Sequence, residues 1–104
     1  MSGIKLESEY DDLDKYAYDN KTIYYYKKNT NIAHNPYGPS IIGENGMKIY
    51  HIEDVLHRLD GPAIIHSNGE ERYLINGYFL TKEQFEIYPE RLKFLGKQHL
   101  ICLI

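Results

Sequence analysis

The amino-acid sequence predicts a mainly β protein, an antiparallel meander of stacked hairpins with one short C-terminal helix. A 23-residue segment is followed at once by a second version of itself, with no gap between the two. Each version carries an Asn-Gly pair between two short β-prone runs. A fixed period with turn residues in phase is typical of a repeat architecture. Asn-Gly is a strong hairpin signal because both residues tolerate positive φ.

The internal repeat divides the chain into units that align over residues 34–56 and 57–79. Nine aligned positions are identical: His34/His57, Gly38/Gly61, Pro39/Pro62, Ile41/Ile64, Ile42/Ile65, Asn45/Asn68, Gly46/Gly69, Tyr50/Tyr73 and Ile52/Ile75. Within a single domain we expect five segments. They are an acidic segment at 1–14, a degenerate repeat at 15–33, repeats at 34–56 and 57–80, and a helical cap with an apolar tail at 81–104.

Turn residues delimit the strands of the meander. A third Asn-Gly pair, Asn76-Gly77, should reverse the chain once more after the second repeat. The expected strands lie at about 16–18, 22–28, 39–43, 47–52, 63–66, 71–75 and 78–80. Together they predict a meander of about seven or eight strands.

The pattern changes after the last expected strand. Thr81 followed by Gln84 three residues later fits a capping box, and Pro89 should end the helix that it starts. Phe85 and Tyr88 share one face of this helix, which we expect to cover the edge of the sheet. Residues 98–104 return to a β-like composition, and their apolar side chains should be covered within the sheet or at a subunit interface.

Composition narrows the classes of protein to which the chain can belong. Its net charge of −3 argues against binding nucleic acid through a basic surface. Its longest apolar run, 100–104, is far shorter than the roughly 20 residues of a membrane span. Cys102 is the single cysteine, and no apolar run like that of a signal peptide precedes Tyr10. We therefore expect a cytoplasmic protein, in the host cytoplasm if the chain is viral, with no cofactor.

Side-chain alternation in the second strand of each unit suggests which face binds a partner. Identical residues at Tyr50/Tyr73 and Ile52/Ile75 indicate the core side, so the variable side between them should face water or a partner. Three consecutive tyrosines upstream, at 24–26, must also expose at least one ring. The predicted partner-binding residues are Tyr24, Tyr26, Ile49, His51, Arg72 and Leu74.

The second unit reads H-R-L-D-G-P-A over 57–63 and Y-L-I-N-G over 73–77. On these residues the chain resembles repeat proteins of the MORN type (membrane occupation and recognition nexus). It is most similar to their H-R-x-D-G-P-A variants, which are common in bacteriophage and giant-virus genomes. The resemblance covers about residues 34–86 and implies stacked β-hairpins with scaffold, dimerisation or lipid-headgroup roles. The usual Tyr-x-Gly-x-Trp core is replaced by E-R-Y-L-I at 71–75, which weakens the inference of lipid binding.

Three alternatives assign chemistry to particular side chains. His34, His57 and Asp60 could form a ligand-binding, metal-binding or hydrolytic cleft, although a histidine before a Gly-Pro turn also suits a hydrogen bond that fixes the turn. The acids within residues 7–14 could imitate a nucleic-acid backbone or form a solvated segment. A zinc site could in principle combine His51, His66, His99 and Cys102.

The sequence favours a non-catalytic protein-interaction module over these alternatives. The phage-like resemblance extends this interpretation to a viral accessory protein that binds and neutralises a host factor. We expect the partner to be a host or viral protein. The open sheet edges and the apolar end of the chain favour a homodimer over a monomer.

Overall fold

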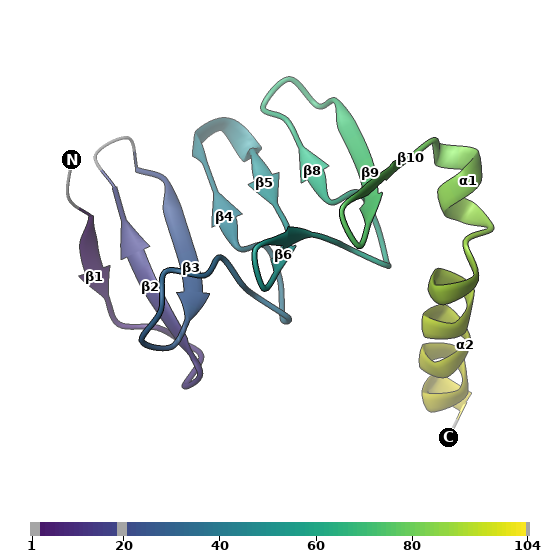
Figure 1. Cartoon of the computed structure of the whole chain (residues 1–104), viewed down its shortest axis with the longest axis horizontal. Coiled ribbons are helices and arrows are strands. Elements are labelled where there is room, and N and C mark those ends of the chain that lie inside the picture. The colour runs from purple at the N-terminus through teal and green to yellow at the C-terminus, as the bar shows by residue number, and fades with distance from the viewer. Residues whose placement is uncertain (1–2, 19–20, 104) are drawn as a thin grey trace.

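The computed structural model describes residues 3–18 and 21–103, with side chains described as far as residue 96. Within these residues the chain is a meander of antiparallel strands followed by helix, so the predicted fold class is confirmed (Figure 1). The elements are β1 (Ile4–Leu6), β2 (Leu13–Ala17), β3 (Ile23–Lys27), β4 (Ile41–Ile42), η1 (Glu44–Gly46), β5 (Lys48–Ile49), β6 (His51–Ile52), β7 (Val55–Leu56), β8 (Ile64–Ile65), β9 (Glu71–Ile75), β10 (Tyr78–Leu80), α1 (Lys82–Glu86) and α2 (Pro89–Leu103).

Eight of the strands described form one sheet in the order β1-β2-β3-β4-β5-β8-β9-β10, and each neighbouring pair is antiparallel. The order departs from the sequence only between β5 and β8, where β6 and β7 fold out as a separate two-stranded hairpin. The sheet is one layer thick, and the helices lie beyond its last strand rather than over a face (Figure 1). The helices therefore leave most of the sheet uncovered.

The expected strand at 47–52 is divided at Tyr50 into β5 and β6. The Tyr50 amide donates to the carbonyl of Ala63 over 2.8 Å, and the Tyr50 carbonyl accepts from the amide of His57 over 3.2 Å. The main chain of Tyr50 thus bonds to the following unit, while the residues on either side pair with different strands. In the second unit the predicted strand is unbroken, and β9 spans 71–75 as expected.

Main-chain hydrogen bonds recur at the spacing of the sequence repeat. The amide of Ser40 donates to Ile49 over 2.8 Å, and that of Ala63 donates to Arg72 over 2.9 Å. Further bonds recur 23 residues apart, namely Asn35 to His51 with Arg58 to Leu74, and Gly43 to Met47 with His66 to Glu70. In the upstream segment, Tyr25 donates to Ser40 as Tyr50 donates to Ala63, so Tyr25 occupies the place of Tyr50.

The three Asn-Gly pairs all lie in turns between antiparallel strands, but they do not share one geometry. Asn45-Gly46 and Asn76-Gly77 have positive φ at both residues, as a tight hairpin turn requires. At 68–69 only Gly69 has positive φ, at 90°. The side chain of Asn68 instead accepts a hydrogen bond from the amide of Glu70 over 3.0 Å, which stabilises a wider turn.

Core residues come from both sides of the strands. Ile75 is fully buried, as expected for the invariant side, but Leu74 on the variable side is also only 1% exposed. The expected division into a core side and an open side is therefore wrong at this strand. The reason is that Leu74 follows the point where β9 leaves β8 and pairs with β10, so it packs inside the corner between two hairpins.

The C-terminal region begins as predicted and then differs. Thr81 caps α1 through a complete capping box with Gln84, and α1 ends before Pro89. Its Phe85 is buried against the ring of Tyr73, with 4.7 Å between the ring centroids. Pro89 then begins a second helix, α2, which continues to Leu103, so the β-like ending expected at 98–104 is wrong over 98–103, and residue 104 lies outside the described residues. Proline suits the first turn of a helix because its missing N–H has no partner there.

Candidate interaction surface

A continuous row of side chains crosses one face of the sheet from strand to strand. Residues directly opposite each other in neighbouring strands lie on the same face. Following the register gives the row Lys5, Tyr16, Tyr24, Ile41, Ile49, Ile64 and Arg72. Three predicted partner-binding residues, Tyr24, Ile49 and Arg72, therefore share one face. We call this set the tyrosine–isoleucine row.

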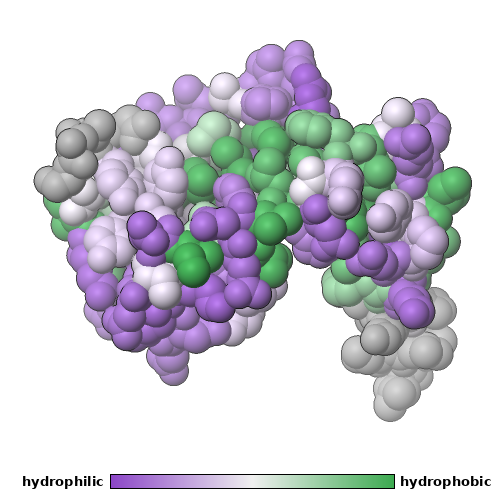
Figure 2. Space-filling view, viewed as in Figure 1, coloured by the Kyte–Doolittle hydropathy of each residue, from purple (hydrophilic) through white to green (hydrophobic). Residues whose placement is uncertain are grey.

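The row is only partly covered by the rest of the molecule. Tyr24, Ile49 and Ile64 are half-buried, Ile41 is buried, and Arg72 is exposed. Figure 2 shows hydrophobic surface gathered over the middle strands of the sheet, whereas the loops at its lower left are hydrophilic. Sequence reasoning missed Ile41 and Ile64, although each begins an Ile-Ile pair at an invariant position of the repeat.

A cluster of four tyrosines continues the row at the N-terminal end of the sheet. Tyr24 and Tyr26 lie with their rings nearly parallel, 5.9 Å apart between centroids. Tyr16 and Tyr18 meet them edge-on, at 5.7 and 5.0 Å. The hydroxyls of Tyr18 and Tyr26 are 3.1 Å apart, and burial together with this bond raises the pKa of Tyr26. The phenol of Tyr26 therefore stays neutral, and the cluster presents apolar rings with polar tips, which suit protein interfaces.

Two predicted contact residues lie inside the sheet instead. The Nδ1 atom of half-buried His51 is 2.8 Å from the hydroxyl of Ser40, which is fully buried, and burial lowers the pKa of His51. Leu74 is buried at the corresponding place of the second unit, and Ala63 there replaces Ser40. A polar pair in one unit thus corresponds to an apolar pair in the next. Leu74 is therefore closed to a partner, whereas His51 is half-buried with its Nδ1 atom engaged by Ser40.

His34 and His57 perform the same structural task in successive units. The Nδ1 atom of His34 accepts a hydrogen bond from the amide of Glu53, and that of His57 accepts from the amide of Asn76, each over 2.9 Å. Both donors belong to hairpin turns 19 residues downstream. The histidines therefore fix these downstream turns rather than the adjacent Gly-Pro turns. Because Nδ1 accepts, the ring must be neutral with its proton on Nε2.

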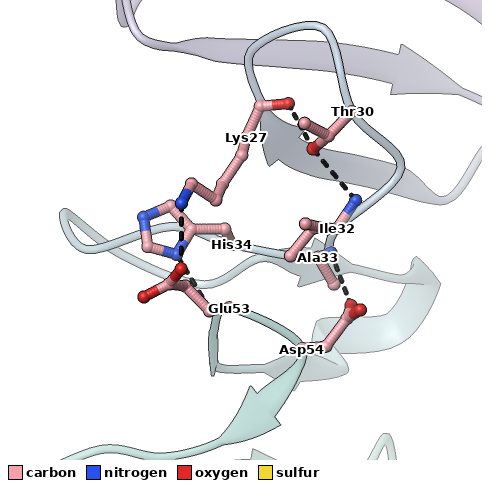
Figure 3. A network of polar contacts seen from close by, with 7 residues as sticks. All are labelled: Lys27, Thr30, Ile32, Ala33, His34, Glu53 and Asp54. Carbon is pink, nitrogen blue, oxygen red and sulfur yellow. Dashed lines mark hydrogen bonds and ion pairs between the residues drawn. The ribbon is translucent and has the colours of Figure 1, made fainter.

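The environment of His34 is a polar network that joins the first clear unit to the segment before it (Figure 3). The Lys27 ammonium lies 2.9 Å from the carboxylate of Glu53, which lowers the pKa of that carboxyl. The amide of Ala33 donates to the Asp54 carboxylate over 2.7 Å, and the Asp54 amide donates to the Ala33 carbonyl over 2.8 Å. These bonds hold one hairpin turn against its neighbour.

Arg58 explains much of the H-R-L-D-G-P-A motif. Its guanidinium lies over the ring of Tyr50 at 4.0 Å and donates to Asp60 over 3.0 Å and to the carbonyl of Pro62 over 3.1 Å. A Cβ atom on Gly61 would lie 2.9 Å from this guanidinium, so a larger residue there would displace it from this position. The motif therefore links the two repeat units. We call the contacts of Arg58 with Tyr50, Asp60 and Pro62 the clasp.

In the first unit Asn35 takes the place of Arg58. Its side-chain amide donates to the carbonyl of Pro39 over 2.9 Å, the position that corresponds to Pro62, and its side-chain oxygen accepts from the amide of Tyr37. Asn35 is only 4% exposed. The two Gly-Pro loops are thus held by different side chains that bind the same carbonyl.

A shallow groove of about 540 Å³ lies between the two Gly-Pro loops. Its lining includes Tyr37, Tyr50, His57, Asp60 and Phe94, the last from α2. Two of the three residues proposed for a cleft, His57 and Asp60, therefore meet at one groove, whereas His34 is not part of its lining. The Asp60 carboxylate pairs with Arg58, and one nitrogen of His57 is occupied by a turn amide.

The acidic segment is folded against the sheet. The Glu9 carboxylate accepts from the hydroxyl of Tyr25 over 2.8 Å, and that of Asp12 accepts from the hydroxyl of Tyr37 over 2.9 Å. Asp14 is 5% exposed and accepts from the amide of Asn29 over 2.8 Å, a bond that lowers the pKa of its carboxyl. These three carboxylates therefore bind their own chain.

No group of three or more His, Cys, Asp or Glu side chains within the described part of the chain is placed to hold a metal ion. Two of the candidate zinc ligands, His99 and Cys102, lie outside the described side chains. No helix in the described ranges, 3–18 and 21–103, is long and apolar enough to cross a membrane.

Comparisons of the chain with family models, curated proteins and solved structures give no significant match. The resemblance to MORN-type repeats is therefore untested by these comparisons, and the roles that it implies remain predictions.

Proposed function

We propose that this chain is a non-catalytic protein-interaction module that binds its partner through the tyrosine–isoleucine row. The observation that carries this proposal is the cross-strand register, which aligns Tyr24, Ile49 and Arg72 on one face of a single-layered sheet. Tyrosine and arginine are enriched among residues that dominate binding energy at protein interfaces. A flat row that combines rings, aliphatic side chains and one guanidinium suits a protein surface better than a small molecule.

The polar side chains that could suggest an enzyme have other roles in the fold. His34 and His57 each accept a turn amide at equivalent positions, and Asp60 pairs with Arg58. A structural role explains why the histidine recurs in phase, whereas catalysis would not require two copies. The groove with His57 and Asp60 is the alternative site for a small ligand, and its shallow form is the argument against that reading.

The partner that we propose is a protein of a host or a virus, in keeping with the phage-like resemblance of the repeat. The row is close to electrically neutral, because Arg72 is its one charged residue apart from Lys5 at the far edge, and Arg72 pairs with Glu70 over 2.7 Å. We therefore expect apolar contact rather than salt-sensitive attraction to dominate binding.

Neighbouring residues that point to opposite faces allow a matched test. Arg72 belongs to the tyrosine–isoleucine row, whereas Glu71 pairs with Ile65 and lies on the other face. The side chains of Arg72 and Glu71 are both exposed. The tagged wild-type chain and the variants Tyr24→Ala, Arg72→Ala and Glu71→Ala are used to capture proteins from lysate, and the captured proteins are quantified by mass spectrometry.

We expect a partner whose capture falls about tenfold or more with Tyr24→Ala and Arg72→Ala, the size of effect typical of a dominant contact. Capture should be unchanged with Glu71→Ala. If capture is lost with Glu71→Ala and retained with the other two, the proposed face is wrong. If capture is instead lost with a further variant, Asp60→Asn, the groove would be favoured as the binding site.

A further inference from the structure

Two hairpins have turns that are held by His34 and His57, and a third turn precedes them in the chain. The three form a series along the chain. We call them side hairpins; they are the turn between Lys27 and Ile32, the β6–β7 pair and the β9–β10 pair. Each contacts the next through one repeated bond. The amide of Asp54 donates to the carbonyl of Ala33, and the amide of Gly77 donates to the carbonyl of Leu56, both over 2.8 Å. The acceptors are 23 residues apart.

Phe79 is the next acceptor in this series, 23 residues after Leu56. The two-residue turn at Asn76-Gly77 makes Ile75 and Tyr78 the hydrogen-bonded pair of the hairpin. Alternation then directs the N–H and C=O of Phe79 away from β9, toward the outer edge of β10. The residue that would continue the series is number 100, but α2 holds it in a helix. The series therefore ends at Phe79, whose main-chain carbonyl and amide have no hydrogen-bond partner among the described residues.

Side-chain exposure indicates that a neighbour is missing at this edge. Tyr78 is 70% exposed and Phe79 is 68% exposed. Their counterparts one unit earlier are better covered, since Val55 is 43% exposed and Leu56 is half-buried. α1 covers Tyr73 through Phe85 but leaves Tyr78 and Phe79 exposed. Two large aromatic side chains on opposite faces of one edge strand are unusual in a protein without a partner there.

The other end of the series is already closed by the chain itself. The amide of Asn29, in the first side hairpin, donates to the carboxylate of Asp14, and the amide of Lys28 donates to the carbonyl of Asp12. These two turn amides are therefore not available to a copy of β10. The other edge strand, β1, has Lys5 at its centre, and a charged residue on an edge strand disfavours pairing.

We propose that β10 pairs with β10 of a second copy of this chain, antiparallel and about a twofold axis at Phe79. In such a pair Phe79 and Phe79 of the second copy exchange both main-chain hydrogen bonds, because residues directly opposite in an antiparallel pair do so at alternate positions. The strand offers three uncharged residues, so no like charges meet. Pairing of identical strands gives a closed dimer rather than a filament.

The first test measures the mass of the full chain in solution by light scattering. We expect twice the monomer mass of 12.2 kDa for the wild type. Phe79→Lys should halve the mass while leaving the circular dichroism spectrum unchanged, because this side chain is exposed in the monomer. The matched control is Ile4→Lys, at an equally exposed position on β1, which should remain a dimer. A monomeric wild type would overturn the proposal, as would a dimer disrupted by Ile4→Lys and not by Phe79→Lys.

The second test fixes the register by disulfide formation in a Cys102→Ser background. Cα atoms of a hydrogen-bonded antiparallel pair lie about 5.5 Å apart, which is within the range of a disulfide. Phe79→Cys should therefore give a covalent dimer on mild oxidation. Tyr78→Cys should not, because Tyr78 would face Leu80 of the second copy. Equal cross-linking by both variants, or by Tyr78→Cys alone, contradicts the proposed axis.

Discussion

At the scale of single residues, two histidines in this chain accept hydrogen bonds from main-chain amides, and that task depends on protonation. Burial lowers the pKa of His57 below its ordinary value of 6.5, and nearby Glu90 opposes this effect without cancelling it. The unfolded chain therefore takes up a proton at a higher pH than the folded chain does. The stability that the neutral ring contributes is complete above pH 6.5 and is lost as the pH falls below it.

The first prediction is that His57→Asn removes this acid sensitivity. The amide oxygen of asparagine can accept from Asn76 but does not titrate. We expect the free energy of unfolding, measured by urea denaturation, to fall between pH 7.5 and 5.5 by less in His57→Asn than in the wild type. His57→Ala should lose about 1 kcal/mol at pH 7.5, the typical contribution of one hydrogen bond. His66→Asn, at an exposed histidine, should behave as the wild type does.

The second prediction concerns the glycine of the clasp. Gly61→Ala should displace the Arg58 guanidinium, which then loses its position over Tyr50 and its bond to Pro62. We expect a loss of about 1–2 kcal/mol in thermal or chemical unfolding, the sum of one exposed cation–π contact and one hydrogen bond.

Two comparisons separate this mechanism from a general intolerance of alanine in the loop. Gly38→Ala should change stability by less than about 0.5 kcal/mol, because the nearest atom to its Cβ would be 4.0 Å away. In an Arg58→Ala background, Gly61→Ala should cost nothing further. An equal loss with and without Arg58 would contradict the clasp.

At the scale of elements, the sequence predicted turns and strand order better than it predicted faces. Asn-Gly pairs and the Thr81 capping box act through neighbouring residues, so their signals are local, and both elements occur where expected. Leu74 is buried because it lies in a corner between two hairpins. The alternation of side chains along one strand cannot predict such a corner. α2 was missed because a β-like composition at 98–104 does not distinguish a strand from the end of a helix that starts at Pro89.

The candidate surface shows the same limit. Ile49 and Arg72 were selected as variable positions and Tyr24 as one of three consecutive tyrosines. Their common face follows from cross-strand register, which depends on long-range pairing. Tyr24 and Arg72 lie four strand pairings apart, so only the assembled sheet relates them. The alternation of side chains predicts which residues of one strand share a face. It does not predict which strands will pair in the sheet.

The third prediction concerns replacing a polar pair of the first unit by the apolar pair found at the same positions in the second. Ser40 and His51 form a polar pair where the next unit has Ala63 and Leu74. Ser40→Ala alone should cost about 1–2 kcal/mol, because it leaves the Nδ1 atom of half-buried His51 without its partner. The double variant with His51→Leu should be more stable than the sum of the single changes by about 1 kcal/mol or more, measured as a double-mutant cycle. Simple additivity would show that the two side chains act independently.

At the scale of the whole molecule, the stack is closed at its N-terminal end by Asp14. The fourth prediction is that Asp14→Ala costs about 1–3 kcal/mol, since the amide of Asn29 loses a charged acceptor. The lowered pKa of Asp14 means that its contribution is complete above its ordinary pKa of 3.8 and is lost as the pH falls further. Asp11→Ala, at an exposed neighbour, is the control and should be neutral in urea denaturation at pH 7.

Nearly every strand of the sheet pairs with the strand that precedes or follows it in the chain, and the one exception skips only a short hairpin. Contacts are therefore formed between residues close in sequence, so little loop-closure entropy opposes each step of assembly. Proteins of low contact order fold fast for their size, whereas β-sandwiches with distant pairings take milliseconds to seconds. Refolding after dilution from denaturant should accordingly be quicker than is usual for a protein built almost wholly of strands.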